Sequence, residues 1–191
     1  MAETSFLQNP SVAAFVGAAS AFFLITLNDW RRKRVKRRVL KAVIDDQAEL
    51  AKDKIEGIRT NLNMLKDNQF TASPFMPFSI NQVSSLHNEV VEILNSHENK
   101  GIHILLYWMS AIDKLLDRIL VKSEKLEYLF RVNGPNNERE FLAKWILDDL
   151  NDAIRNMDLI IRLFSLYTSG EAHKMVEFEH EVPKPPTLGD Q

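Results

Sequence analysis

Histidines and acidic side chains are the residues of this 191-residue chain whose types could hold a metal ion or move a proton. A di-metal carboxylate site in a helical bundle needs Glu-x-x-His on two inward helix faces and two further glutamates. The sequence contains that motif once, from Glu177 to His180. His87, His97 and His103 cluster with Glu89, but their spacing matches no zinc motif. We therefore expect no metal and no cofactor.

Signatures of other catalytic classes are also missing from the sequence. The chain has no cysteine, which excludes a disulfide framework, a thiolate nucleophile and a cysteine-based metal site. Its six glycines are scattered and form no phosphate-binding loop, and no serine elbow or kinase signature occurs. The acidic residues Asp148, Asp149 and Asp152 are expected on a solvated helix face. We predict that the protein is not an enzyme.

One dipeptide gives a different prediction. Arg155 and Asn156 resemble the start of the Arg-Asn-x-x-x-His motif of HEPN ribonucleases, which are all-α proteins common in bacterial defence. The resemblance implies an arginine and a histidine that face a cleft between two protomers and cleave RNA. Ile160 stands at the histidine position, so the resemblance extends at most to a degenerate, non-catalytic bundle, such as the membrane-anchored accessory proteins of RNA-targeting CRISPR systems.

The strongest signal for location is the stretch SAFFLITLNDWRRKRVKRRVLK at residues 20–41. No charged residue occurs between Thr4 and Asn28, and residues 11–27 are apolar or small on every helix face. Pro10 suits the first position of a helix, and Trp30 suits a membrane interface. A helix over 10–30 has the length of a membrane span at about 1.5 Å per residue.

Eight cations follow this apolar stretch at once. They are Arg31, Arg32, Lys33, Arg34, Lys36, Arg37, Arg38 and Lys41. A cleavable signal carries its cations before the apolar part, so we interpret 10–30 as a single-pass signal anchor. The positive-inside rule places residues 1–9 across the inner (plasma) membrane and the remainder in the cytoplasm. The alternative is a central helix buried in a water-soluble bundle, which leaves the cations unexplained.

Two surfaces of this segment have their own interpretations. Ala13, Gly17 and Ala21 recur every fourth residue, a pattern that lets membrane helices approach closely and that favours homo-oligomers. The basic cluster is expected to act as a topology signal and to bind the membrane surface, since each cation near anionic headgroups contributes about 1 kcal/mol. Nucleic acid is a poorer match because Trp30 is the sole aromatic residue near the run.

Beyond the basic run the chain is acidic, with 16 basic against 24 acidic residues over 42–191. Apolar residues spaced three and four apart predict helices packed by coiled-coil-like seams. The expected fold is all-α: a transmembrane helix that continues into a cytoplasmic up-and-down bundle of about four long helices. The seam residues in the first, third and fourth helices are Ile44, Ala48, Ala51, Ile55, Ile58, Leu62 and Leu65; Leu105, Trp108, Ile112, Leu115, Ile119, Leu126 and Leu129; and Leu142, Ile146, Leu150, Ala153, Met157, Ile160, Phe164 and Tyr167.

The boundaries follow from prolines, glycines and capping residues. Residues 31–66 form the basic juxtamembrane segment and first cytoplasmic helix, 67–78 an aromatic and proline-containing loop, 79–170 the remaining helices, and 171–191 a flexible tail. Ser79 with Gln82 and Asn137 with Glu140 are expected as capping boxes, Gly101 is expected to end a turn, and Gly170 is expected as a C-terminal cap. Phe70, Phe75 and Met76 of the loop are candidates for a partner surface.

These observations predict a membrane-anchored, non-enzymatic interaction protein that self-associates or docks a cytoplasmic protein partner. The lipid bilayer and further copies of the chain are its expected partners. A first alternative is an oligomeric effector that permeabilises or perturbs the membrane, in phage defence or a CRISPR accessory role. A second is a HEPN-like ribonuclease with a degenerate motif.

Overall fold

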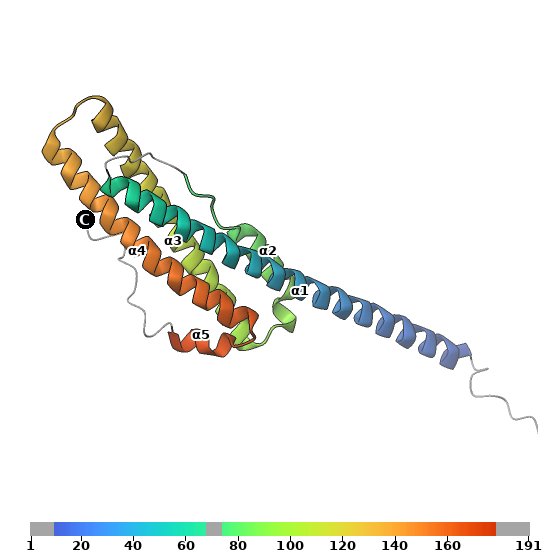
Figure 1. Cartoon of the computed structure of the whole chain (residues 1–191). Coiled ribbons are helices and arrows are strands. Elements are labelled where there is room, and N and C mark those ends of the chain that lie inside the picture. Colours follow the sequence, from blue (N-terminus) through green and yellow to red (C-terminus); the bar gives the residue numbers. More distant parts are fainter. Residues whose placement is uncertain (1–9, 68–73, 179–191) are drawn as a thin grey trace, which may run out of the picture.

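The structure is a computed structural model that describes residues 10–67 and 74–178. Its elements in chain order are α1 (Pro10–Lys66), α2 (Ile80–Val90), the short 3-10 helix η2 (Val91–Ile93), α3 (Ser96–Arg131), α4 (Asn136–Thr168) and α5 (Ala172–Phe178). The predicted all-α bundle of about four helices is confirmed, although α2 has only 11 residues. The second half of α1 packs against α2 and α4, and α3 packs against α4 and α5 (Figure 1).

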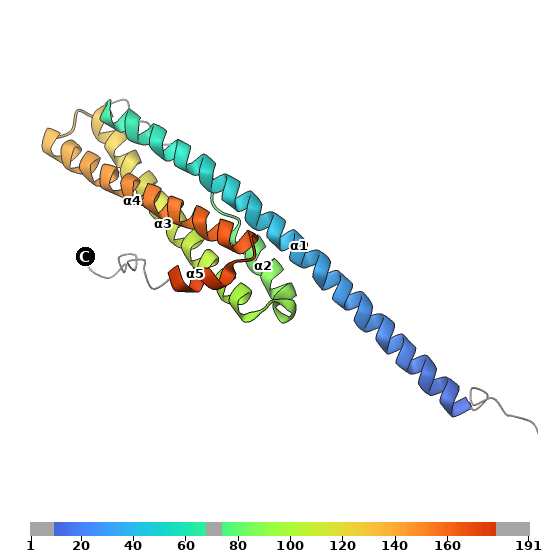
Figure 2. The same cartoon turned by 60° about the horizontal axis from the view of Figure 1, so that its bottom comes forward.

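Helix α1 is one uninterrupted helix of 57 residues. Its first part extends away from the other helices, and its second part lies along the bundle (Figures 1 and 2). No side chain between residues 14 and 39 is buried, and Leu40 is the first residue of α1 in the core. The N-terminal helix therefore continues without a break into the first bundle helix, a question that the sequence left open.

The predicted seams form the core. Every seam residue of α4 is buried, and those of α1 and α3 are buried apart from Ala48, Leu62 and Leu115, which are half-buried against the same cluster. Seams at helical spacing bury their apolar area only when the helices pack side by side, which explains the bundle.

Helices α3 and α4 form an antiparallel pair, and the NGPNN stretch at 133–137 separates them as predicted. Asn133 takes a positive φ of 52°, and the Gly134 amide donates a hydrogen bond of 2.8 Å to the Leu129 carbonyl. Helix α4 ends at Thr168, and two residues later Gly170 has φ = 85° and lacks the Cβ that would strain this conformation. The Glu171 amide then bonds the Leu166 carbonyl at 2.8 Å, which is the expected C-terminal cap.

The predicted capping boxes at the starts of α2 and α4 are wrong. The Ser79 side chain makes no cap hydrogen bond, and Pro135 occupies the N-cap of α4. The real capping box joins Asn95 and Glu98 at the start of α3. Amides at the entry to α2 are satisfied from other helices instead, because Gln47 of α1 accepts from the Ser79 amide at 2.7 Å.

The flexible-tail prediction for 171–191 is wrong for its first part, because residues 172–178 form α5, and residues 179–191 lie outside the described residues. Ala172 and Met175, one helical turn apart, are buried against α3. They meet Gly101, which lies inside α3 and does not end a turn as expected. A Cβ on Gly101 would come within 3.1 Å of Met175 Sδ and 3.3 Å of Tyr167 Cδ2. Glycine at 101 thus allows α5 to approach the bundle.

Gly101→Leu should displace α5 from the bundle, because the added side chain needs the space that Met175 and Tyr167 occupy. We expect the free energy of unfolding to fall by about 1–3 kcal/mol, the usual range for overpacking a core. Hydrogen exchange at the amides of 172–178 should rise while α4 stays protected. Lys100→Leu is the matched control because residue 100 is exposed. Unchanged α5 protection in Gly101→Leu would contradict this account.

A membrane span is not supported by the described helices. Over 10–67 and 74–178, none of them has both the length and the apolar character that crossing a bilayer requires. The predicted span at 10–30 overlaps the uncharged stretch 4–28, and the side chains of residues 1–13 lie outside the described part.

Candidate membrane-contact segment and basic cluster

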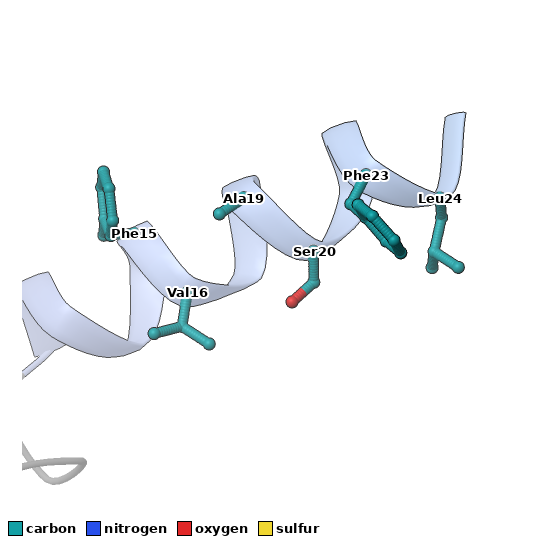
Figure 3. Close-up of a pocket in the computed structure, with 6 residues that line it drawn as sticks. All are labelled: Phe15, Val16, Ala19, Ser20, Phe23 and Leu24. Carbon is teal, nitrogen blue, oxygen red and sulfur yellow. The ribbon is translucent and has the colours of Figure 1, made fainter. Parts of the chain in front are cut away.

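The apolar segment of α1, residues 14–27, projects from the bundle with its side chains uncovered. Figure 3 shows Phe15, Val16, Ala19, Ser20, Phe23 and Leu24 lining a shallow groove on the surface of this single helix. The four consecutive residues 22–25 are 63–73% exposed. Because successive residues turn by about 100° around a helix, these four present apolar surface on every side.

The predicted oligomerisation face lies on this segment. Gly17 and Ala21 are exposed, and apart from the adjacent residues and the backbone of its own helix no atom lies within 4 Å of the position that a Cβ on Gly17 would occupy. The side chain of Ala13 lies outside the described residues. Arg31 and Arg38 follow Gly17 by 14 and 21 residues, so on the continuous helix they lie about 40° and 60° around the axis from Gly17.

The structure divides the basic cluster into two sets. Three cations face the bundle and form ion pairs: Lys33 with Glu92 at 2.5 Å, Lys36 with Glu89, and Arg37 with Glu98. We call Lys33, Lys36 and Arg37 the inner cations. Their carboxylate partners come from α2, η2 and the first turn of α3, so the same end of the bundle adjoins the base of the apolar segment.

Glu98 is the most enclosed of these carboxylates and has two structural roles. Its side chain is 9% exposed and pairs with Arg37. The Asn95 amide donates to Glu98 Oε2 at 3.1 Å, while the Glu98 amide donates to Asn95 Oδ1 at 2.8 Å. The capping box of α3 therefore also holds the carboxylate that pairs with Arg37 of α1.

Of the remaining cations of the cluster, the four arginines are exposed and Lys41 is half-buried. In the described part of the chain, Arg31, Arg32, Arg38 and Lys41 form no ion pair with a carboxylate. The Arg34 guanidinium lies 3.8 Å from the centroid of the Trp30 ring. Such a cation–π contact holds a charge beside the indole without neutralising it.

A buried polar network joins α1, α2 and α3 deeper in the bundle. Lys54 has a side chain only 3% exposed, and its Nζ lies 2.8 Å from Asp113 Oδ1 and 3.7 Å from the Phe78 ring centroid. The Phe78 amide donates to Asp113 Oδ2 at 2.9 Å. Burial lowers the pKa of Lys54 from its ordinary value of 10.5, and hydrogen bonding to Asp113 opposes that effect. Each oxygen of the Asp113 carboxylate therefore accepts one hydrogen bond.

The histidines predicted to hold no metal form two separate ring pairs. His87 lies 5.0 Å from His103 and His97 lies 6.4 Å from His173, measured between ring centroids. His87 is buried, and its Nε2 lies 3.0 Å from Asn99 Oδ1. Among the described residues, no group of three or more metal-binding side chains converges.

The prediction that Asp149 lies on a solvated face is wrong. Asp149 is buried at the α3–α4 contact, where its oxygens lie 2.8 Å from Arg118 and from Lys122. Its aspartate neighbours at 148 and 152 are not buried. The cations stand 31 and 27 residues earlier in the chain, so helical periodicity alone gave no signal for this contact.

An exposed aromatic pair on α4 was missed. Phe141 and Trp145 have ring centroids 4.6 Å apart and are 55% and 40% exposed. Lys122 Nζ lies 4.7 Å from the Trp145 ring centroid. The signal was present in the sequence, because the two residues are one helical turn apart and each precedes a seam residue by one position.

The three candidate residues of the 67–78 loop have different outcomes. Phe70 lies outside the described residues. Phe75 is half-buried and approaches Gly57, where a Cβ would lie 3.2 Å from its ring. Met76 is 71% exposed. Of the two candidate residues that the structure describes, Met76 is therefore the exposed one.

The HEPN-like dipeptide does not assemble a site. Arg155 is exposed and pairs with Asp152 on its own helix. Asn156 is half-buried, and Ile160 at the histidine position is wholly buried in the core. A side chain at 160 therefore faces away from the arginine and from solvent.

The chain matches no protein-family model, no curated protein and no solved structure.

Proposed function

We propose that the protein is a membrane-anchored interaction protein. The apolar segment of α1 lies in the inner membrane with residues 1–9 on the far side, and the helical bundle is held at the cytoplasmic face, where it binds a protein partner or a second copy. No catalytic role is proposed for the bundle.

The observation that carries this proposal is the exposure of apolar side chains on every side of residues 14–27. An aqueous environment makes such a surface unfavourable by about 25 cal/mol per Å². The bundle cannot cover it, because the helix is straight and the bundle begins only near residue 33. Lipid would cover all sides of the segment at once, whereas a protein groove would cover one side.

The test is the fractionation of cells that express the full-length chain. We expect the protein in the membrane pellet, resistant to an alkaline carbonate wash and released by detergent. Protease added from the cytoplasmic side should digest the bundle. Recovery of the chain in the soluble fraction without detergent, as a large homogeneous assembly, would show that other copies cover the segment and would overturn the proposal.

A second candidate is the oligomeric, membrane-perturbing effector. The continuity of α1 favours it, because a rearrangement of the bundle would reach the apolar segment through a single rigid helix. A pore requires more than two copies in one nanodisc, so a measured mass of one or two copies excludes this candidate.

A further inference from the structure

The basic cluster of α1 has a face that the bundle does not use. We propose that Arg31, Arg34, Arg38 and Lys41, here called the outer cations, form a binding site for the headgroups of anionic glycerophospholipids. The inner cations are committed to the bundle and take no part. This inference rests on the proposed membrane anchor and specifies which lipid the anchor's cytoplasmic base selects.

The spacing of the outer cations places them on one side of α1. They follow one another by three, four and three residues, which is the spacing of a single helix face. Leu40 of the same helix is wholly buried on the opposite side, against the bundle. Arg31, Arg34 and Arg38 are exposed and form a stripe on the side of α1 away from the core, and the half-buried Lys41 lies at the edge of that stripe.

The inner and outer cations differ in whether a carboxylate of the bundle pairs with them. Each inner cation has a carboxylate of the bundle as partner. A phosphodiester that bound there would have to displace a carboxylate already held in place, Glu98 by its capping box. The outer cations need no such exchange, so their attraction to phosphate is not offset by a lost ion pair.

Position along the helix puts the stripe at the level of the headgroups. At about 1.5 Å per residue, Arg31 and Arg34 lie within about 6 Å of Trp30 along the axis, and Arg38 and Lys41 lie about 12 and 16 Å from it. Surface potentials decay over about 8–10 Å at physiological salt. The first two cations thus reach the headgroups of an upright helix, and the last two reach them when α1 tilts toward its outer face.

Tilting toward the outer face moves the bundle away from the bilayer, because the bundle lies on the other side of α1. Anionic lipid would therefore bind the stripe and also fix the bundle's orientation. Zwitterionic lipid offers the same phosphate but compensates its charge with choline, so it should bind the stripe less well.

Trp30 provides a probe at the site, since the Arg34 guanidinium lies over its ring. Full-length protein is reconstituted into vesicles that contain equal amounts of phosphatidylglycerol and phosphatidylcholine, with one or the other lipid dibrominated. The ratio of Trp30 quenching by the two brominated lipids measures local enrichment, after subtraction of the signal from a Trp30→Phe variant. We expect enrichment of the anionic lipid of about threefold or more in the unmodified chain, given about 1 kcal/mol per cation.

Two triple variants remove the same charge from opposite sides of one helix. Arg31→Gln/Arg34→Gln/Arg38→Gln should bring the ratio to one, and Lys33→Gln/Lys36→Gln/Arg37→Gln should leave it unchanged. An equal loss in both variants would overturn the assignment to one face. Loss of enrichment in excess inorganic phosphate at constant ionic strength would show a site for free phosphate and overturn the lipid assignment.

The same data separate this inference from the proposed function. Quenching by both lipids at a ratio of one in the unmodified chain overturns the headgroup site and leaves the anchor intact. Absence of quenching by either lipid means that Trp30 lies far from the bilayer, and the anchor fails as well.

Discussion

Asp113→Ala should lower the free energy of unfolding by about 3–5 kcal/mol, the usual consequence of removing one member of a buried ion pair. The substitution leaves the Lys54 ammonium in a site only 3% exposed, with the Phe78 ring as its remaining close partner. It also removes the acceptor of the Phe78 amide at the entry to α2. Urea unfolding followed by circular dichroism measures the change.

Lys54→Met is the matched control on the other side of the pair. It removes the buried charge and keeps an unbranched apolar side chain of similar length, while Asp113 retains the Phe78 amide as donor. We expect a loss of less than about 1.5 kcal/mol, since replacing buried charge by apolar surface is often nearly neutral. Equal losses in the two variants would show that packing, and not the unpaired ammonium, sets the cost.

The pH dependence of Asp113→Ala has a definite sign. Burial lowers the pKa of Lys54 in the folded chain, and removal of Asp113 takes away its main opposing contact. The unfolded chain then binds more protons than the folded one between that lowered pKa and 10.5, so stability rises with pH across this window. The double variant Lys54→Met/Asp113→Ala should lack this rise.

The seams of the bundle could be predicted from sequence because helix packing depends on local spacing. The residues from Ile44 to Leu65 are spaced at helical intervals within one segment, and burying them requires no knowledge of the partner helix. The same holds for the stop at 133–137, where turn residues act on their own backbone. Such features are encoded within a few turns of chain.

Contacts between distant segments could not be predicted in this way. Lys54 and Asp113 are 59 residues apart, and Arg37 and Glu98 are 61 apart. Helical spacing shows that a charge interrupts or flanks a seam, but it does not show which opposite charge will lie beside it. The sequence therefore predicted one uniform basic cluster, whereas in the structure carboxylates of the bundle pair with the inner cations.

Helix α5 was missed for a related reason. Among residues 172–176, whose side chains the structure describes, two belong to the core, which is too few to give a periodic signal, and the VPKPP stretch beyond the helix favoured a tail. Its binding site is the gap beside Gly101, and a glycine in the sequence does not reveal whether it makes a turn or receives a neighbouring side chain.

Ser20→Arg/Leu24→Arg should move the protein from the membrane pellet to the soluble fraction or into aggregates, with the bundle's stability unchanged. The Leu, Ile, Phe and Val residues of the segment contribute roughly −2.1 to −4.2 kcal/mol toward insertion in total, at about −0.3 to −0.6 kcal/mol for each of seven. Two arginines near the centre of the span cost about 5–7 kcal/mol, so insertion becomes unfavourable. Both substituted residues lie outside the core, so urea unfolding should be unaffected.

Val35→Arg/Val39→Arg is the matched control. It introduces two arginines with the same four-residue spacing, at positions 15 residues further along the same helix. Both valines are exposed, at 57% and 44%, and lie within the basic cluster. Added cations there should leave the protein in the membrane, because they strengthen the positive-inside signal. If both double variants stay in the pellet, or both leave it, the apolar side chains of 14–27 do not hold the protein there. If Ser20→Arg/Leu24→Arg leaves the membrane and Val35→Arg/Val39→Arg stays, burial of residues 14–27 in lipid accounts for membrane retention. The introduced side chains, their charge and the helix that carries them are the same in both variants.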